Sequence, residues 1–466
     1  MKVNSEMMAA PNAAAPRSLV LSPPHRVIAR GQGPFRTTIL SLNDDGRGVA
    51  RVDGKVTFIE GALPGEEVSF VLEKRRKNYD QGWAVEVHSQ SPDRVVPRCG
   101  YFGLCGGCSL QHLDSAAQIR EKEQVLRDKL RQFGKLTPAS WLAPVTGPPW
   151  GYRRSARLGV RYVEKKGGIL IGFREKRSSY ITPLRSCEVL DPRIAVLLPA
   201  LYDLIPALSC FTRIPQIEAV CGDDTVALVF RHLEPFTAED RARLTGFAQH
   251  HAIHLYGQFG GPESITSIWV PDNAPLTYRL PDYDLKYEFK PTNFVQINAE
   301  INRRMVGRAV ELLEPGPGDH VLDLFCGLGN FTLPLARQAG RVTGVEADGA
   351  LIASAQVNAR LNAIANVEFR QADLYDAGQA AAFWNGFRCD RMLIDPPRSG
   401  ALEVIKTLPG PEKSRRIVYV SCNPATLARD AEYLVNVLGY SLASIGVMDM
   451  FPQTNHVESI AVFDGG

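Results

Sequence analysis

No run of apolar residues in this 466-residue chain approaches the length of roughly 18 that a membrane-spanning helix needs. The first 33 residues are rich in Ala, Pro and Ser, and they lack both the basic start and the apolar stretch of a secretory signal. We therefore expect residues 1–33 to be a disordered tail, with a transit peptide as the alternative. We also expect a cytosolic protein without a membrane partner.

The composition excludes several broad classes of protein. Apolar residues make up 45% of the chain and charged residues 22%, which is ordinary for a globular protein with a sizeable core. These values exclude a wholly disordered chain, a collagen-like fibre and a disulfide-dense mini-protein. At about 150 residues per domain, the length suggests about three domains.

The nine cysteines are an odd number for a secreted disulfide framework, and they are unevenly placed. Cys99, Cys105 and Cys108 lie within ten residues of one another, whereas the other six are spread from Cys187 to Cys422. In a reducing compartment, such a cluster indicates metal or redox chemistry rather than disulfides. By spacing alone, and given a fourth thiolate, it suits a [4Fe–4S] cluster and a tetrahedral zinc ion about equally.

The formal charge of +3 hides an asymmetry along the chain. Residues 1–190 carry 30 Lys and Arg against 18 Asp and Glu, whereas residues 191–466 carry 23 against 32. Ten basic and only three acidic residues fall between Gly151 and Leu190. This asymmetry predicts a polyanion that binds at one end of the molecule, although a merely solvated basic face explains the charges equally well.

Short strands bounded by turn residues are predicted near the N-terminus: Thr37–Ser41, Val49–Val52, Val56–Ile59, Glu67–Leu72 and Trp83–Val87. Strands of this length and spacing are typical of a small oligonucleotide-binding barrel, here over residues 34–92. The basic run Lys74–Lys77, followed by Tyr79, would lie on a loop that can bind phosphate and stack a base. The alternative is a plain structural barrel with a soluble hairpin tip.

The rest of the chain divides into two patterns. Residues 93–280 have a mixed α+β pattern that includes the cysteine cluster, an amphipathic helix and the basic segment, and no catalytic motif is recognisable in 151–280. Over residues 281–466, helices alternate with apolar strands at Val321–Phe325, Arg341–Val345, Val367–Arg370, Arg391–Ile394 and Ile417–Val420. This alternation predicts a doubly wound parallel sheet. The predicted fold class is therefore multidomain: a β-barrel, a central α+β region and a Rossmann-like α/β domain.

The segment Asp323–Phe331 (DLFCGLGNF) follows a strand and begins a helix, as a turn that binds a nucleotide-type cofactor does. Gly327 and Gly329 permit the tight turn, and Glu346, after the next strand, can accept both ribose hydroxyls. The third glycine of a dinucleotide motif is absent, and Asp323 would repel a pyrophosphate. An acid there suits S-adenosylmethionine, whose methionine end is positive. Acids also follow the third and fourth strands, where such sheets bind ligands: Asp373 and Asp395.

Cys422 lies between a predicted strand and a predicted helix, where its thiol pKa is expected to fall below the usual ~8.5 so that it acts as a thiolate. A buried, inert cysteine is the alternative. Methylation of carbon 5 of uracil needs such a thiolate, because addition of sulfur to carbon 6 makes an enolate that can take the methyl group. A base must then remove the proton from carbon 5, and Glu458 is the candidate.

Five motifs closely resemble those of the RNA uracil-C5 methyltransferases: Phe294–Asn298 (FVQIN), Asp323–Phe331, Asp395–Arg398 (DPPR), Ser421–Pro424 (SCNP) and His456–Glu458 (HVE). The resemblance extends from Phe35 to Phe463. The N-terminal segment resembles a TRAM domain, and the cysteine cluster resembles an iron–sulfur site. This combination is similar to the bacterial members of the family that act on 23S ribosomal RNA, the RumA/RlmD type.

The resemblance implies that Cys422 is the nucleophile and Glu458 the base. It assigns contacts with S-adenosylmethionine to six residues: Gln296, Phe325, Asn330, Glu346, Asp373 and Asp395. It also supplies the fourth thiolate, so that a [4Fe–4S] cluster, with zinc as the alternative, would be held by Cys99, Cys105, Cys108 and Cys187. The implied product is 5-methyluridine in 23S ribosomal RNA, made by a monomer on a uridine flipped out of the stack.

Three other hypotheses remain open. The target could be a uridine of transfer RNA or a different ribosomal uridine. The chain could be a nucleic-acid-binding module with an inactive methyltransferase domain. A cytosine-C5 DNA methyltransferase shares the thiolate chemistry, but its nucleophile normally follows a proline, whereas Cys422 precedes Asn423 and Pro424.

Overall fold

The computed structural model describes residues 19–21, 32–408 and 414–465, and it divides into two units. The first unit runs to residue 96 and includes 112–114, and the second comprises 97–111 and the chain from 115 onward. Most of the predicted tail, residues 1–18 and 22–31, lies outside the described residues. Within it, Leu19–Val20 forms strand β1, which pairs with β7 (Tyr79–Ser89).

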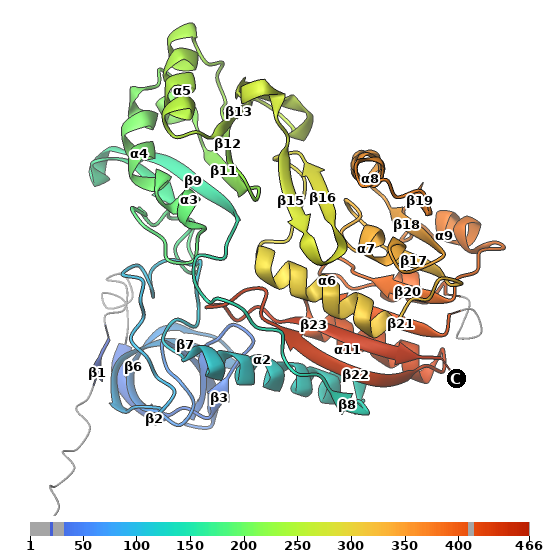
Figure 1. The fold of residues 1–466 in the computed structure, drawn as a ribbon. Helices are drawn as coiled ribbons and strands as arrows, with labels where there is room; N and C mark the ends of the chain where they lie inside the picture. Colours follow the sequence, from blue (N-terminus) through green and yellow to red (C-terminus); the bar gives the residue numbers. More distant parts are fainter. Residues whose placement is uncertain (1–18, 22–31, 409–413, 466) are drawn as a thin grey trace, which may run out of the picture. The chain divides into compact units, whose positions relative to one another are not determined.

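The first unit is a seven-stranded sheet in which β1 pairs with β7 beside the path β2-β6-β7-β5-β4-β3 (Figure 1). The remaining strands are β2 (Gln32–Thr38), β3 (Ser41–Leu42), β4 (Gly48–Val52), β5 (Lys55–Glu60) and β6 (Glu67–Arg75). Because the Leu40 amide, between β2 and β3, donates to the Val49 carbonyl of β4, the two ends of the path meet and close the predicted barrel. Apolar side chains pack its interior, with Ile59, Val68 and Phe70 completely buried. Lys74–Lys77 is exposed, but only Arg76 and Lys77 lie in the predicted loop, because Lys74 and Arg75 end β6 and pair with β7.

The second unit begins with a six-stranded sheet, ordered β10-β9-β11-β12-β13-β14. Its strands are β9 (Ser155–Val163), β10 (Gly168–Gly172), β11 (Gln216–Cys221), β12 (Val226–Arg231), β13 (His254–Gln258) and β14 (Ile265–Trp269). Helices α4 (Leu197–Leu204) and α5 (Ala238–His250) bury their apolar sides against it. Helix α5 begins with a capping box, in which the side chains of Thr237 and Asp240 each accept a hydrogen bond from the other residue's backbone amide.

The C-terminal sheet has eight strands in the order β19-β18-β17-β20-β21-β23-β22-β8. The predicted parallel strands are β17 (His320–Leu324), β18 (Arg341–Glu346), β19 (Val367–Gln371), β20 (Arg391–Ile394) and β21 (Arg416–Ser421). The sequence analysis missed three further strands: β22 (Ser441–Met448), β23 (Glu458–Asp464) and β8 (Ser140–Trp141). Because β8 pairs with β22 and β15 (Leu276–Leu280) with β16 (Leu285–Phe289), residues 93–280 contribute strands to three sheets.

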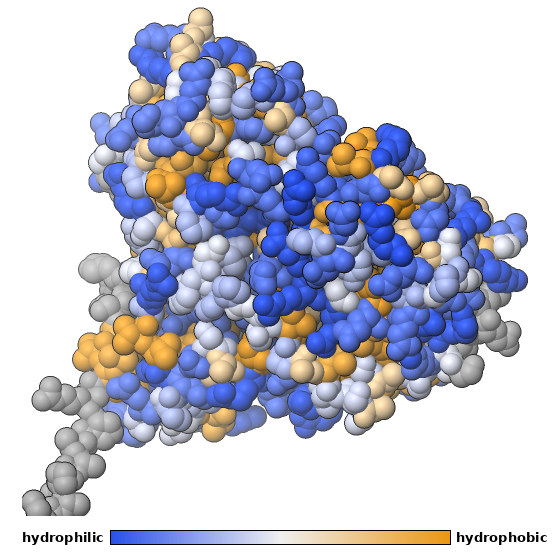
Figure 2. All heavy atoms as spheres, viewed as in Figure 1, coloured by the Kyte–Doolittle hydropathy of each residue, from blue (hydrophilic) through white to orange (hydrophobic). Residues whose placement is uncertain are grey.

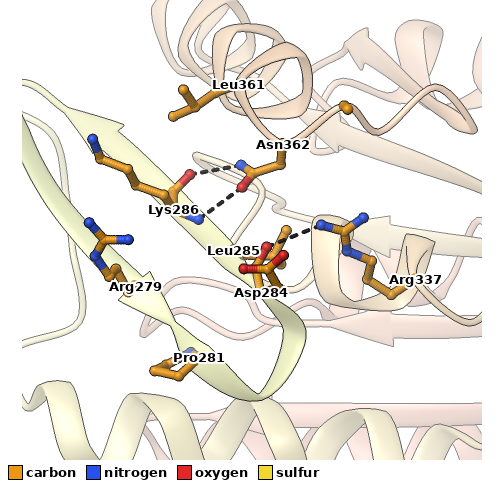
Figure 3. A pocket seen from close by; sticks show the side chains of 9 residues that line it. Arg279, Pro281, Asp284, Leu285, Lys286, Arg337, Leu361 and Asn362 are labelled. Atoms are coloured by element: carbon orange, nitrogen blue, oxygen red, sulfur yellow. Dashed lines mark hydrogen bonds between the residues drawn. The ribbon is translucent and has the colours of Figure 1, made fainter.

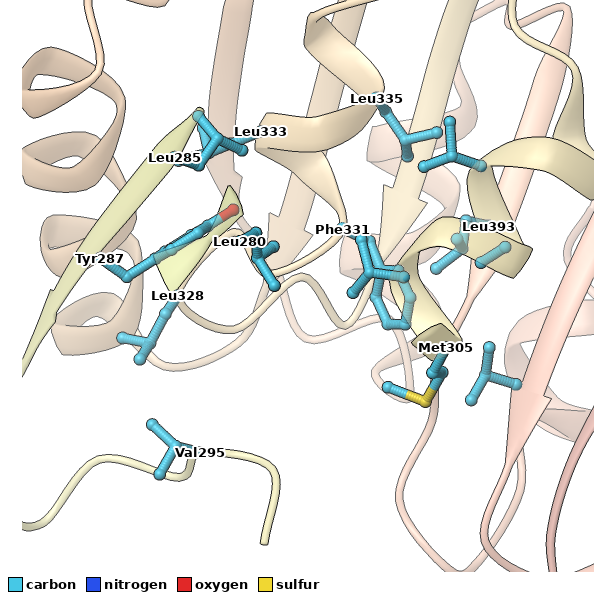
Figure 4. Close-up of a cluster of buried hydrophobic side chains, with 14 of the residues drawn as sticks. Leu280, Leu285, Tyr287, Val295, Met305, Leu328, Phe331, Leu333, Leu335 and Leu393 are labelled. Atoms are coloured by element: carbon cyan, nitrogen blue, oxygen red, sulfur yellow. The ribbon is translucent and has the colours of Figure 1, made fainter. Parts of the chain in front are cut away.

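Helices lie on both faces of this sheet, which explains why its strands are apolar runs. One buried cluster includes α6 (Ala299–Leu313) and α7 (Thr332–Ala336), and the other includes α2 (Ser115–Lys129), α9 (Ala377–Trp384) and α11 (Pro424–Asn436). The hairpin of β15 (Leu276–Leu280) and β16 (Leu285–Phe289) joins the first cluster, as Tyr287 packs near Leu328 and Leu333 (Figure 4). The predicted fold class is confirmed.

The strand order places a crevice at one end of the sheet. Strand β17 lies between β18 and β20, so the chain continues to opposite sides of β17 and the strand order reverses there. In open α/β sheets, ligands bind at the carboxyl ends of the strands next to such a reversal. No described helix is long and apolar enough to cross a membrane. Figure 2 shows hydrophobic residues in small groups among hydrophilic ones on the face that it draws.

Candidate active site

The turn after β17 has a backbone conformation that favours glycine. Phe325, Gly327 and Gly329 all have positive φ angles, of 65°, 54° and 87°. The Gly327 amide donates to Glu346 Oε2 at 3.3 Å, and the Asp348 amide donates to Glu346 Oε1 at 3.0 Å. The turn and the acid after β18 therefore form one structure at the crevice.

Asp323, at the carboxyl end of β17, is completely buried. Its Oδ2 accepts a hydrogen bond from the Thr332 hydroxyl at 2.5 Å, while Oδ1 has no hydrogen-bond partner among the described residues. Burial, with Asp395 and Glu346 nearby, raises the pKa of Asp323 to about 8. A buried carboxyl group with an oxygen that lacks a partner among the described residues would be stabilised in its charged form by a positively charged ligand, such as the methionine end of S-adenosylmethionine.

Asn330 is held by neighbouring elements rather than by solvent. Its amide donates to Asn302 Oδ1 at 2.9 Å, and its oxygen accepts from Asn302 Nδ2 and from the Tyr278 hydroxyl, each at 3.1 Å. Asn302 is on α6, and the loop before that helix carries Gln296, which is half-buried. These contacts leave the Asn330 side chain little capacity for a ligand, so its expected cofactor contact would use the backbone.

Of the other predicted cofactor residues, Phe325 follows β17, Asp373 lies on the loop after β19, and Asp395 follows β20. The rings of Phe325 and Tyr375 are 5.8 Å apart and tilted by 42°, and the Tyr375 hydroxyl donates to the Gly400 carbonyl at 2.7 Å. Asp373 is exposed and accepts from the Tyr375 amide at 3.0 Å. An aromatic surface with an acid beside it can flank a purine ring and its amino group.

Cys422 and Glu458 come together because of strand register. Ser421, the last residue of β21, pairs with Ser459 of β23, so the same register places Cys422, directly after β21, opposite Glu458, the first residue of β23. Burial, followed by the charge of Asp395, raises the pKa of Glu458 to about 8, and Arg398 opposes this shift. Burial likewise raises the pKa of Asp395 to about 7. With Asp323, the crevice thus holds three carboxyl groups whose protonation changes near neutral pH.

The expectation that the pKa of Cys422 is lowered is wrong for this structure. Burial raises it to about 11, with Glu458 and Asp395 adding to the shift and Arg398 opposing it. The start of α11 cannot compensate, because Asn423 caps that helix with its own side chain. The thiol of the free protein therefore keeps its proton.

Arg398 and His456 are site residues to which the sequence analysis gave no role, although both lie inside quoted motifs. Burial, followed by the charge of Arg398, lowers the pKa of His456 to about 4. The neutral ring can then accept at Nδ1 from Arg398 Nη2, which lies 3.0 Å away. This contact holds a guanidinium near Cys422 and Glu458.

The loop before β23 is clamped by residues from the start of the second unit. Gln453 is buried and has a φ of 66°, a strained value for a residue that is not glycine. Its amide donates to Gln118 Oε1 at 2.9 Å, and its carbonyl accepts from the amides of Ser109 and Leu110, both at 3.0 Å. Lys122 of α2 forms an ion pair with Asp449, which lies on the same loop, at 2.6 Å. The segment directly after Cys108 thus braces the loop that leads to Glu458.

The four predicted metal-binding cysteines line one small hollow: Cys99, Cys105, Cys108 and Cys187. Burial raises the thiol pKa to about 11 at Cys105 and about 12 at Cys108, and it also raises that of Cys187. Thiols that oppose one another's ionisation in an apolar hollow fit a site where bound cations displace protons. No group of three or more His, Cys, Asp or Glu side chains in the described ranges has the arrangement of a metal-ion site, so the cluster stays a prediction.

Comparison with known proteins agrees with these features. The tRNA (uracil-5-)-methyltransferase family model matches residues 115–464, and the TRAM domain model matches residues 35–83. A 23S rRNA (uracil(1939)-C(5))-methyltransferase, RlmD, of Aromatoleum aromaticum is 50% identical over 91% of this chain and 98% of its own. The RlmD of Alcanivorax borkumensis is 52% identical over 92% of this chain and 96% of its own.

A solved structure shares the fold. The tRNA (uracil-54, C5)-methyltransferase of Pyrococcus abyssi, in complex with S-adenosyl-L-homocysteine, superposes with a TM-score of 0.70 at 25% identity. The similarity covers 92% of this chain and all of the other. With a barrel that matches TRAM and a crevice that carries the family's motifs, the chain belongs to the RNA uracil-C5 methyltransferases.

Proposed function

We propose that this protein methylates carbon 5 of a uridine in 23S ribosomal RNA, using S-adenosylmethionine, as a cytosolic monomer. The observation that carries the proposal is that the register of β21 and β23 places Cys422 opposite Glu458, beside the buried acids of the crevice. The substrate follows from relatives that are 50% and 52% identical over almost their whole length. Bound S-adenosylmethionine would supply the methyl group as an electrophile.

The side chains of the crevice then have separate roles. Cys422 releases its proton to solvent, the charge of Arg398 stabilises the thiolate, and the sulfur bonds to carbon 6 of the flipped uracil. Carbon 5 takes the methyl group, and the Glu458 carboxylate accepts the proton from carbon 5. The bond between sulfur and carbon 6 breaks, and the thiol regains a proton. The balance is one methyl group in exchange for one proton.

The cofactor contacts are part of the proposal. Glu346 would bind the ribose hydroxyls, Asp373 and the Phe325 ring the adenine, and Asp395 and Gln296 the region between the donor and the uracil. Asn330 would contribute its backbone, because its side chain is bonded to Asn302 and Tyr278. For affinity, Lys74–Lys77 and the basic segment Arg153–Arg177 would contact phosphates, which makes RNA binding strongly salt-dependent.

We also propose that Cys99, Cys105, Cys108 and Cys187 hold a [4Fe–4S] cluster, with zinc as the alternative. Such a cluster would tie two distant parts of the second unit together without a redox role. Broad visible absorbance with four iron and four sulfide ions per chain in anaerobically purified protein would support this assignment. One zinc ion per chain in colourless protein would contradict it.

A methyl-transfer assay tests the function. Wild-type protein, Cys422→Ala and the control Cys389→Ala are incubated with labelled donor and either 23S ribosomal RNA or transfer RNA. Cys389 is a buried thiol before the amino end of β20, so the control removes a sulfur from the same sheet but not from the cofactor turn. We expect 5-methyluridine in ribosomal RNA from wild type and the control, and none from Cys422→Ala. Product only in transfer RNA would favour the second candidate function, methylation of a uridine in transfer RNA. The fold shared with the Pyrococcus abyssi enzyme supports that alternative.

A further inference from the structure

A basic hollow of about 500 Å³ lies beside the β15–β16 hairpin, and we refer to it as the hairpin hollow (Figure 3). It is lined by nine residues from the hairpin, the end of α7 and the end of α8 (Gly349–Leu361). Three of them are cations, namely Arg279, Lys286 and Arg337, and Asp284 is the one acid. None of the residues assigned to catalysis or to cofactor binding lines this hollow.

Two of the cations face each other without an acid between them. Arg279 and Lys286 are directly paired across the hairpin, and their side chains extend to the same side of it (Figure 3). Like charges in directly opposed positions of a strand pair destabilise the pair. Neither side chain makes a hydrogen bond or an ion pair within the described ranges of the chain. An anion bound between them would remove this repulsion.

The frame around these cations is fixed by hydrogen bonds. Arg337 donates to the carbonyls of Tyr283 and Asp284 at 3.2 and 3.1 Å, which holds its guanidinium beside the hairpin turn. The Asn362 side chain bonds to both the amide and the carbonyl of Lys286, at 2.9 and 2.7 Å (Figure 3). A preorganised frame reduces the entropy lost when a ligand binds.

We propose that the hairpin hollow binds phosphodiester groups of the RNA substrate, at a contact separate from the catalytic crevice. Arginine and lysine are the side chains that bind RNA phosphates, and a hollow of about 500 Å³ admits a nucleotide. Its lining contains no aromatic ring on which a base could stack. The hollow therefore positions the RNA backbone and does not read its sequence. This inference rests on the proposed function, since it assumes an RNA substrate.

The test compares RNA binding by wild type, the double variant Arg279→Gln/Lys286→Gln and a matched control, Arg243→Gln/Arg341→Gln. The control also removes two exposed positive charges, but these are already paired with Glu239 and Glu368. We expect the hollow variant to bind a ribosomal RNA fragment several-fold more weakly. The slope of log K against log salt concentration should fall by about 0.7 to 0.9 for each phosphate that the variant no longer binds. Methylation at saturating RNA and the KM for the methyl donor should not change.

Three results would overturn the inference: an unchanged salt slope, an equal loss of affinity in the control, or a raised KM for the donor. A fourth would be that wild type binds inorganic phosphate and the hollow variant does not, while both bind RNA with the same affinity. The hollow would then bind a free anion rather than RNA. Failure of the proposed function would look different. Wild-type protein would make no 5-methyluridine, while its RNA binding would still depend on the hollow.

Discussion

Replacement of Glu458 by Gln should stabilise the protein while it abolishes turnover. The side chain is 5% exposed, and burial raises its pKa to about 8 from an ordinary value of 4.5. Between those two pH values the unfolded chain releases the proton and the folded chain keeps it. Stability from this group is therefore fully present below pH 4.5 and is lost as the pH rises to about 8. At pH 7 the loss is about 3 kcal/mol, and Gln, which does not titrate, avoids it.

Calorimetry of both proteins at several pH values measures this effect. The unfolding temperatures of wild type and Glu458→Gln should be similar at about pH 5, and the variant should unfold several degrees higher at about pH 8. An aspartate on the surface, changed as Asp128→Asn, provides the control, because it should show no pH-dependent difference. A variant that is less stable than wild type at pH 8, or that still makes 5-methyluridine, would refute this account of Glu458.

The remaining predictions concern the same loop and crevice. The wild-type value of kcat/KM should rise with pH through about pH 8 as Glu458 ionises, and a flat profile from pH 6 to 9 would contradict its role as the base. Gln118→Ala should lower stability by about 1–3 kcal/mol and reduce kcat with little change in the KM for RNA, because the strained Gln453 loses the hydrogen bonds that its amide and side chain make with Gln118. Gln124→Ala, on the same helix, should do neither, since among the described residues that side chain bonds only to Asp128. Lys122→Met should cost about 3–5 kcal/mol, measured by denaturant unfolding, because it leaves Asp449 buried and unpaired; a loss below about 1 kcal/mol would show that this pair is not structural.

The parallel strands and the cofactor turn could be predicted because their signals are local. Apolar runs such as Ile417–Val420 must be buried on both faces, and the glycines at 327 and 329 require a turn with positive φ. The antiparallel strands β22 and β23 could not be placed, because their position depends on register with β21, a contact between distant segments. The two-residue strand β8 has no sequence signal at all.

The site shows the same division. Position after a strand identified Cys422, Asp395 and Glu346, since topology alone brings these chain positions to one crevice. The pKa of Cys422 could not be predicted from its place before a helix, because burial and two nearby carboxyl groups outweigh the helix terminus. The clamp on Gln453 was equally out of reach, because its hydrogen bonds join residues more than 300 positions apart.

The most direct test of the account is the covalent bond between Cys422 and uracil. Glu458→Gln protein is incubated with ribosomal RNA and S-adenosylmethionine, denatured, digested with trypsin and nuclease, and analysed by mass spectrometry. The account predicts a peptide containing Cys422 that carries a methylated uridine nucleotide, because the proton on carbon 5 cannot be removed. A modified nucleotide on another cysteine, or complete conversion to free 5-methyluridine, would contradict it.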